Sequence, residues 1–235
     1  MKKIIITGSS GSIGSYLANH YKKKFKVIGL DKFSSNIKGI EFYKVDLLKT
    51  SDLNKIYRRI FKKHKKVNIL INAAGYIHNE LFLNFSHSFK THEYKNWKKV
   101  FNNNVDITFL NTKVYVDYFS KNFQDEKIII NFSSINSDGV IGQIAYSSAK
   151  SAIETMTKVL SKELSKFNFR IACISPGYLK VKSTLDNINK KNLEKVIDSI
   201  PLKKLGNARD IASGIDFIIK NKYFNGKVLK IDGGK

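Results

Sequence analysis

The chain has 235 residues, of which 42% are hydrophobic and 26% are charged, and this balance excludes an intrinsically disordered protein. Its net charge of +23 would favour a nucleic acid or another anionic partner. The excess is lysine, however, and the lysines are spread over most polar segments, without the interleaved aromatic residues of a base-stacking groove. We therefore expect no nucleic-acid partner.

The apolar runs are far shorter than the roughly 20 residues that cross a bilayer. The apolar stretch at residues 4–6 is also too brief for the core of a secretory signal. The single cysteine, Cys173, cannot form an internal disulfide, which is typical of a reducing compartment. We expect a cytoplasmic protein without membrane contact.

Strand-like and helix-like segments alternate along the chain, and the strand-like ones are almost continuously apolar, which indicates a parallel sheet covered on both faces. The pattern predicts an α/β fold: a single doubly wound, Rossmann-like domain over residues 1–235, with a mostly parallel seven-stranded sheet and helices on both faces. Strands are expected at residues 3–7, 25–31, 40–46, 67–73, 128–133, 170–175 and 227–232. Helices are expected at residues 12–24, 51–64, 97–121, 146–166, 192–200 and 209–220.

The first expected strand runs into the sequence TGSSGSIG, Thr7 to Gly14. In a doubly wound sheet the first strand-to-helix turn is the usual seat of a phosphate group. Gly8 would allow a tight turn, Gly11 would keep side chains away from a pyrophosphate, and Gly14 would let helix and strand pack closely. The start of the helix would present its amides to the anion. The cofactor contacts predicted here are Thr7, Gly8, Ser10, Gly11, Ser12, Ile13 and Gly14.

The second expected strand ends in Asp31, 17 residues after Gly14. This spacing is close to the roughly 20 residues at which an acidic residue binds the ribose hydroxyls of a dinucleotide. A carboxylate there repels the 2′-phosphate of NADP, so NAD is the expected cofactor. The neighbouring Lys32 could accept that phosphate, which leaves NADP as an open alternative.

Tyr146 and Lys150 are four residues apart in an expected helix, so their side chains share one face. A cation near the phenol would lower its pKa from about 10 toward the working pH. Such a phenol can donate a proton to a carbonyl oxygen as hydride arrives, or accept one from an alcohol. With the dinucleotide turn, the pair predicts hydride transfer between a nicotinamide and a small-molecule carbonyl or alcohol substrate.

Further motifs follow in order. They are Asp46 in Val-Asp-Leu, Asn72-Ala73-Ala74-Gly75, Trp97 with Asn104 seven residues later, Asn131-Phe132-Ser133-Ser134, Pro176-Gly177, and the closing Ile231-Asp232-Gly233-Gly234. Together with the glycine turn and the Tyr–Lys pair, they resemble the compact, single-domain branch of the short-chain dehydrogenase/reductase family over nearly the whole chain. The length and the C-terminal layout are similar to those of 3-oxoacyl carrier-protein reductases, although Asp31 departs from their usual NADPH pattern.

The resemblance implies roles for several residues. Tyr146 would be the general acid/base, and Lys150 would lower its pKa and bind the nicotinamide ribose. Ser134 would hydrogen-bond the substrate oxygen, and Asn104 would hold a water molecule that links Lys150 to solvent. Asp46 would meet the adenine. The implied cofactor contacts are Asp46, Leu47, Asn72, Ala73, Ala74, Gly75, Asn104, Tyr146, Lys150, Pro176 and Gly177.

The sequence departs from the family pattern in three places. The glycine spacing looks like that of the extended branch of sugar-nucleotide epimerases, although the short C-terminal part opposes that branch. Ser133 and Ser134 lie 13 and 12 residues before the tyrosine; the first is the commoner separation, and the local pattern favours Ser134. Val181 stands where the family often has a threonine, and Ser183 and Thr184 remain open as substitutes.

Two other classes of function stay in view. One is an NAD-dependent sugar or nucleotide-sugar epimerase or dehydrogenase, and the other is a catalytically silent dinucleotide-sensing regulator, which the intact Tyr, Lys, Ser and Asn set argues against. His87 and His92 are five residues apart, a poor arrangement for one metal, so no metal is expected. Residues 76–94 are expected to form a loop at the substrate mouth. Surplus apolar residues on the helices around 104–121 and 146–166 predict a homotetramer or a homodimer.

Overall fold

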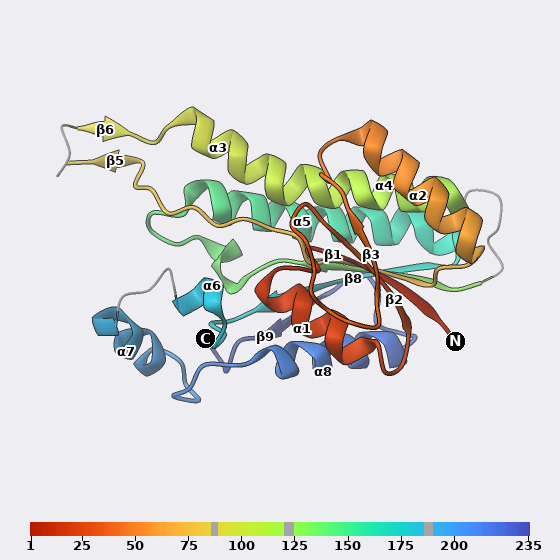
Figure 1. Cartoon of the computed structure of the whole chain (residues 1–235). Coiled ribbons are helices and arrows are strands. Elements are labelled where there is room, and N and C mark those ends of the chain that lie inside the picture. Colours follow the sequence, from red (N-terminus) through yellow and green to blue (C-terminus); the bar gives the residue numbers. More distant parts are fainter. Residues whose placement is uncertain (86–88, 120–124, 186–189) are drawn as a thin grey trace.

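Seven parallel strands form one sheet (Figure 1). The computed structural model describes residues 1–85, 89–119, 125–185 and 190–235. The strands are β1 (Lys3–Thr7), β2 (Lys26–Asp31), β3 (Glu41–Lys44), β4 (Ile69–Asn72), β7 (Lys127–Phe132), β8 (Phe169–Pro176) and β9 (Val228–Ile231). Their order, β3-β2-β1-β4-β7-β8-β9, and their parallel pairing confirm the predicted doubly wound sheet.

Helices cover both faces of the sheet. They are α2 (Thr50–His64), α4 (Ile107–Phe119) and α5 (Ile144–Leu164) on one face, and α1 (Ser12–Tyr21) and α8 (Ala208–Lys220) on the other (Figure 1). Neighbouring residues of a strand point to opposite faces. Ile5 of β1 therefore packs in the core under α2 and α4, whereas Ile4 and Ile6 pack in the core under α1 and α8. The strands are apolar throughout because each one serves both cores.

The helix expected at residues 97–121 is divided into pieces. The helix α3 (Tyr94–Phe101) runs into a π-helical turn, η1 (Asn102–Asp106), which continues as α4; residues 120 and 121 lie outside the described part. Within η1 the side chain of Asn104 is fully buried, and its Nδ2 donates to the carbonyl oxygen of Val100 at 2.8 Å. Such π turns within α-helices often mark functional sites.

A small hairpin, the 3₁₀ turn η3 (Ser165–Phe167) after α5 and three other short helices complete the described fold. The strands β5 (Leu83–Asn84) and β6 (Lys90–Thr91) pair antiparallel inside the segment expected to be a loop. Strands of two residues are too short to show an alternating pattern in the sequence. The short helices are the 3₁₀ turn η2 (Ile135–Asp138), α6 (Lys182–Leu185) and α7 (Lys190–Asp198), the last of which was expected at residues 192–200.

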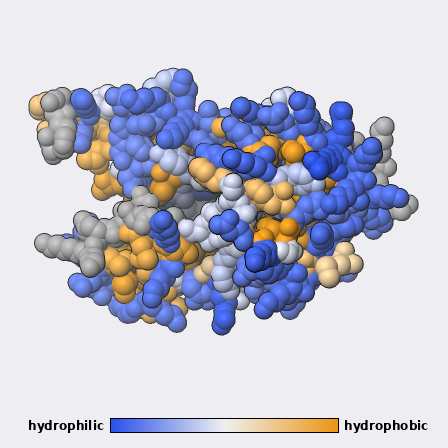
Figure 2. All heavy atoms as spheres, viewed as in Figure 1, coloured by the Kyte–Doolittle hydropathy of each residue, from blue (hydrophilic) through white to orange (hydrophobic). Residues whose placement is uncertain are grey.

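The fold places the ends of two central strands side by side, because Thr7 of β1 pairs in register with Asn72 of β4. The sheet continues to β2 and β3 on one side of this pair and to β7, β8 and β9 on the other. Doubly wound sheets bind ligands beyond the carboxyl ends of the strands at such a switch point. Figure 2 shows the molecule hollowed at the end that carries β5, β6, α6 and α7.

None of the described helices has both the length and the apolar character that a bilayer crossing requires. The visible face is largely hydrophilic, and hydrophobic residues border the hollow and also lie over the middle of this face (Figure 2).

Candidate active site

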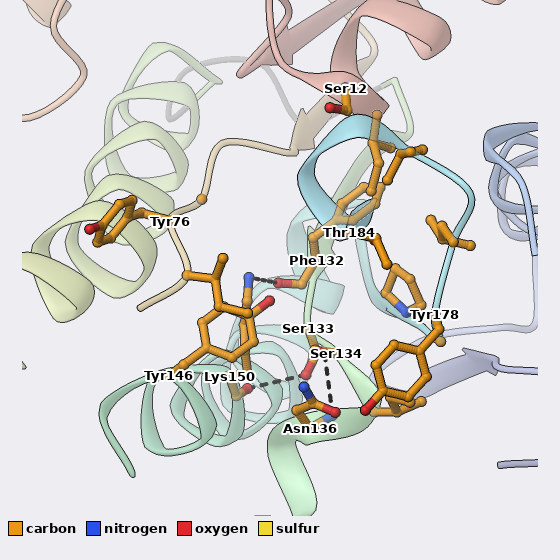
Figure 3. Close-up of a pocket in the computed structure, with 18 of the residues that line it drawn as sticks. Ser12, Tyr76, Phe132, Ser133, Ser134, Asn136, Tyr146, Lys150, Tyr178 and Thr184 are labelled. Carbon is orange, nitrogen blue, oxygen red and sulfur yellow. Dashed lines mark hydrogen bonds between the residues drawn. The ribbon is translucent and has the colours of Figure 1, made fainter. Parts of the chain in front are cut away.

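A cavity of about 650 Å³ opens at the carboxyl edge of the sheet. Its wall combines the turn after β1, the segment after β4, the end of β7, the start of α5 and the segment after β8 (Figure 3). The structure thus brings together segments that are far apart in the sequence. The sequence-predicted residues that line this cavity are Gly8, Gly11, Ser12, Ile13, Gly14, Ala73, Gly75, Asn104, Ser134, Tyr146, Lys150, Pro176 and Gly177.

The turn after β1 requires glycine at two positions. Gly8 has a φ of 67°, in the left-handed region that favours glycine, and a Cβ there would stand 2.7 Å from the backbone of Ala74. A Cβ on Gly14 would stand 2.1 Å from the carbonyl oxygen of Gly8. Gly8 therefore packs the turn against the segment after β4, and Gly14 packs α1 against the turn.

The helix α1 begins at this turn without a side-chain cap. Its N-cap is Gly11, and no side chain bonds the first amides of the helix. Gly11, Ser12 and Ile13 line the cavity. Free amides at the positive end of a helix are suited to an anionic group, so these residues fit the pyrophosphate of a dinucleotide.

Asp31, at the end of β2, is held against the same turn. Its Oδ2 accepts a hydrogen bond from the amide of Ser10 at 2.9 Å, and its Oδ1 accepts one from the amide of Phe33 at 2.9 Å. Each oxygen keeps a lone pair for a further donor. The ammonium of Lys32 lies over the Phe33 ring, 5.3 Å from its centroid.

Tyr146 and Lys150 lie on one face of α5 and line the same part of the cavity (Figure 3). Lys150 is only 4% exposed, and its Nζ donates to the carbonyl oxygen of Phe132, at the end of β7, at 3.0 Å. The ammonium is 5.5 Å from the centroid of the Tyr146 ring. The structure therefore brings the two side chains together at the end of β7.

Burial is the main influence on the acidities of this pair. Burial raises the pKa of Tyr146 to about 12, and a hydrogen bond with Ser134 only partly offsets the rise. Burial also lowers the pKa of Lys150 to about 8, because a desolvated ammonium is disfavoured. In the protein alone the phenol is therefore protonated at neutral pH, and the expected lowering of its pKa by Lys150 stays a prediction.

The two candidate serines have different environments. Ser133 is buried, and its hydroxyl donates to Oε1 of Glu154 at 2.6 Å. Ser134 lines the cavity near Tyr146, and its hydroxyl oxygen accepts from the amide of Asn136 at 3.2 Å. Both serines line the cavity. The hydroxyl of Ser133 is engaged by Glu154, which leaves Ser134 better placed for contact with a ligand.

Glu154 was not singled out in the sequence. Its Oε1 also accepts from the hydroxyl of Ser137 at 2.8 Å. One carboxylate therefore binds Ser133 and Ser137, which precede and follow Ser134 in the chain. The available signal was a carboxylate four residues after Lys150, on the helix face that turns toward the sheet. A single sequence does not show which partner such a carboxylate finds.

Asn104 and Lys150 approach each other across Gly75. Nδ2 of Asn104 donates to the carbonyl oxygen of Tyr76 at 2.7 Å, and its Oδ1 accepts from the Tyr76 amide at 3.4 Å. A Cβ on Gly75 would stand 3.0 Å from Oδ1 of Asn104 and 3.6 Å from Nζ of Lys150. The absence of a side chain at Gly75 leaves these two groups close together at the cavity wall.

The other predicted cofactor residues do not line this cavity. Leu47 packs in the core and is 5% exposed. Asn72 is buried, and its Nδ2 donates to Oδ1 of Asn131 at 2.9 Å. Oδ1 of Asp46 accepts from the amide of Leu48 at 3.1 Å, just before α2. Within the described residues, those predicted but absent from the wall are Thr7, Ser10, Asp31, Asp46, Leu47, Asn72 and Ala74.

Several residues of the wall were not predicted as site residues. Tyr76, Asn136, Gln143 and Tyr178 line the cavity, and they come from loops or short turns that have no periodic pattern. Of the residues left open after Pro176-Gly177, Val181 and Thr184 line the cavity, and the side chain of Ser183 lies outside the described part.

Cys173, on β8, is fully buried within electrostatic range of Lys150. Burial raises the pKa of its thiol to about 12. Of the two histidines considered as metal ligands, His87 lies outside the described residues, and Nδ1 of His92 is 3.1 Å from Oε2 of Glu80. In the described ranges no group of three or more His, Cys, Asp and Glu side chains is arranged to hold a metal ion.

Comparisons with known proteins identify the family. A family model described as enoyl-(acyl carrier protein) reductase matches residues 17–235. The 3-oxoacyl-[acyl-carrier-protein] reductase of Buchnera aphidicola is 32% identical, over 99% of this chain and 97% of its own length. The chain belongs to the short-chain dehydrogenase/reductase family.

Solved structures of short-chain dehydrogenase/reductases share the whole fold. ElxO with NADP bound has a TM-score of 0.87 at 26% identity, covering 99% of this chain and 98% of that one. The 4-hydroxyisoleucine dehydrogenase complexed with NADH has a TM-score of 0.85 at 25% identity, covering 100% and 98%. This short-chain dehydrogenase/reductase is therefore an NAD(P)-dependent oxidoreductase that acts on a small-molecule substrate.

The glycine contacts predict different effects for two alanine substitutions. Gly14→Ala should lower the free energy of unfolding by about 3 kcal/mol or more, because its methyl group meets backbone that cannot move aside. The matched control is Gly11→Ala, whose φ of −76° is ordinary and whose Cβ would stand 3.3 Å from the nearest atom. Urea unfolding without cofactor should show a small effect for the control. Equal stability of the two variants would contradict the packing role of Gly14.

The lowered pKa of Lys150 predicts a pH-dependent stability. Between the folded pKa of about 8 and the unfolded value of about 10.5, the unfolded chain binds the proton and the folded chain does not, so stability rises with pH. Relative to Lys150→Met, the wild type should therefore gain about 2 kcal/mol in unfolding free energy from pH 7 to pH 9.5. Urea unfolding at the two pH values measures this, and a pH-independent difference would show that burial leaves the ammonium unperturbed.

Proposed function

We propose that this short-chain dehydrogenase/reductase passes a hydride reversibly between a nicotinamide and a carbonyl or alcohol carbon, with Tyr146 as general acid/base. The observation that carries the proposal is that Ser134, Tyr146 and Lys150 line the same cavity as the uncapped glycine turn. A bound nicotinamide would supply or accept the hydride. The side chains of this chain supply the proton, the orientation and the stabilisation of charge.

The proton chemistry begins with the phenol. With a pKa of about 12, Tyr146 carries its proton at neutral pH and can give it to a carbonyl oxygen as negative charge develops there. The Ser134 oxygen accepts from the Asn136 amide, and its hydroxyl proton, which bonds the phenol in the free protein, can turn to the same substrate oxygen. Two donors thus converge on one substrate atom. This is the protonation state from which carbonyl reduction starts.

Lys150 stabilises the other protonation state of the phenol. Its ammonium keeps two N–H groups beyond the one that bonds Phe132, and these can bind ribose hydroxyls and offset the charge of a phenolate. Asn104 uses its amide N–H groups on the backbone of Tyr76 and Val100. Its Oδ1 lies across Gly75 from Lys150 and is then the atom that would hold a water molecule. This water would link Lys150 to solvent, from which the proton given up by Tyr146 is replaced.

NAD is the proposed cofactor. The carboxylate of Asp31 is fixed beside the glycine turn by two backbone amides, where its charge disfavours a 2′-phosphate and its lone pairs suit ribose hydroxyls. The ammonium of Lys32 lies over the Phe33 ring. Family members with similar structures include one bound to NADP and one bound to NADH, so similarity alone does not choose between the two cofactors. The negative charge of Asp31 is the observation that supports NAD.

The whole chain is proposed to act as one catalytic domain in the cytoplasm, where the buried, unpaired thiol of Cys173 is suited to a reducing medium. We further propose a homotetramer or homodimer built through the outer faces of α4 and α5. Phe109 on α4 and Val159 on α5 are 51% and 46% exposed, and apolar side chains of this size favour burial between subunits.

Substitution of the phenol tests the proposed chemistry. Tyr146→Phe should lower kcat by about 10²–10⁴-fold, because it removes the proton donor. NADH affinity, measured by fluorescence titration, should change little, since the phenyl ring keeps the packing. Substantial turnover by this variant would remove Tyr146 from its role.

The serine pair provides an internal control for the same assay. Ser134→Ala should lower kcat by about 10²-fold, and Ser133→Ala should act mainly on thermal stability, because that hydroxyl bonds Glu154. The reverse pattern would assign the substrate contact to Ser133.

The cofactor proposal predicts a Michaelis constant for NADH at least about tenfold below that for NADPH, equivalent to about 1.4 kcal/mol. Steady-state kinetics with one carbonyl substrate and both cofactors measures the ratio. Lys32→Met should leave the NADH constant unchanged, because the ammonium is not needed for NAD. A preference of the wild type for NADPH would refute the role of Asp31.

A further inference from the structure

Two side-chain amides line the cavity next to the groups that move the proton. Asn136 lies in η2, and Gln143 directly precedes α5. Nδ2 of Asn136 donates to Oε1 of Gln143 at 2.8 Å. Both residues line the cavity, and neither side chain takes part in the proton chemistry proposed above.

Their positions relate them directly to the reacting oxygen. The backbone N–H of Asn136 donates to the hydroxyl oxygen of Ser134 at 3.2 Å. Gln143 precedes Tyr146 by three residues, which is nearly one helical turn. Figure 3 shows Asn136 next to Ser134, with Tyr178 close by and Tyr146 on the other side of the view. A carbonyl held between Ser134 and Tyr146 would then have one of its neighbouring carbons on the side of Asn136, to which Gln143 is hydrogen-bonded.

The amide pair has a defined hydrogen-bonding capacity. One N–H of Asn136 and one acceptor site of Gln143 satisfy each other, which leaves the NH₂ group of Gln143 as a donor and the carbonyl oxygen of Asn136 as an acceptor. Exchanging nitrogen and oxygen in both amides leaves the same set. A hydroxyl group complements it, because a hydroxyl both donates and accepts. An alkyl group in that place would leave both amide groups unpaired.

We propose that Asn136 and Gln143 bind a substrate hydroxyl that lies one or two carbons from the reacting carbonyl. The substrate class is then hydroxy ketones, which includes the keto forms of polyols and sugars. The inference rests on the proposed carbonyl chemistry at Tyr146. The alternative is a purely structural role, in which the hydrogen bond between Asn136 and Gln143 only connects η2 to α5 and its loss affects all substrates alike.

Matched substrates separate these two roles. In each pair a hydroxyl replaces a methyl group: 4-hydroxybutan-2-one with pentan-2-one, and 1-hydroxybutan-2-one with pentan-3-one. NADH oxidation by the wild-type protein should give a kcat/KM at least about tenfold higher for a hydroxy ketone than for its partner. In the double variant Asn136→Leu/Gln143→Met, which removes both amides and leaves neither unpaired, this ratio should fall close to one.

The outcomes distinguish the inference from the function beneath it. A uniform loss on all four ketones with the ratio retained would mean a structural role and would overturn the inference. A wild-type ratio close to one for both pairs would overturn it as well, even if the double variant fails to fold. Tyr146→Phe is assayed in parallel: ketone reduction that survives it, or no NADH oxidation with any ketone, means that the proposed function itself has failed.

Discussion

The ammonium of Lys150 is almost completely removed from water, and its contact with the carbonyl oxygen of Phe132 attaches it to the end of β7. Removing a charge from water costs free energy that is recovered only through well-placed partners. Here the recovery within the described residues is partial, because burial still lowers the pKa of Lys150 to about 8. The site therefore holds a cation in a place where further hydrogen-bond acceptors and negative charge are favoured, namely ribose oxygens and a developing phenolate.

The position of that cation depends on buried polar contacts between the sheet and its helices. The amide of Asn131 on β7 accepts from Asn72 on β4 at 2.9 Å and donates to Thr157 on α5 at 2.9 Å. Glu154, one turn before Thr157, binds the two serines that flank Ser134. The hydrophobic effect is non-directional, whereas a hydrogen bond needs one partner in one place and an unpaired buried amide is costly. These contacts fix α5, and with it Tyr146 and Lys150, relative to the strand ends.

Much of the fold could be predicted from the sequence because the strands are buried on both faces. A strand with one covered face alternates apolar and polar residues, so continuous apolar runs such as Ile4 to Ile6 indicate that both faces are covered. The residues that follow parallel strands lie at one edge of the sheet. The same reasoning placed the glycine turn beside Tyr146. It could not find the π turn at Asn104, because one extra residue in a helix hardly changes an apolar periodicity.

Properties that depend on tertiary contacts could not be predicted. The pKa of Tyr146 follows from burial more than from the nearby lysine, and burial is decided by segments far away in the chain. Asn72 faces the interior because a strand end alternates between core and cavity over single residues, and Leu47, three residues after β3, packs in the core. Glu154, Asn136 and Gln143 act through partners 7 to 21 residues away, which leaves no local pattern.

The buried thiol of Cys173 has a consequence for how motions of this site can be followed. The thiol lies on β8 near Lys150 and is fully buried. An alkylating reagent therefore reaches it only when α5 or the edge of the sheet briefly separates from the rest of the domain. The rate of alkylation then counts such openings. A nucleotide that binds only the unopened protein reduces the frequency of these openings through mass action. The alkylation rate of Cys173 therefore measures how strongly a bound nucleotide suppresses local opening of the domain.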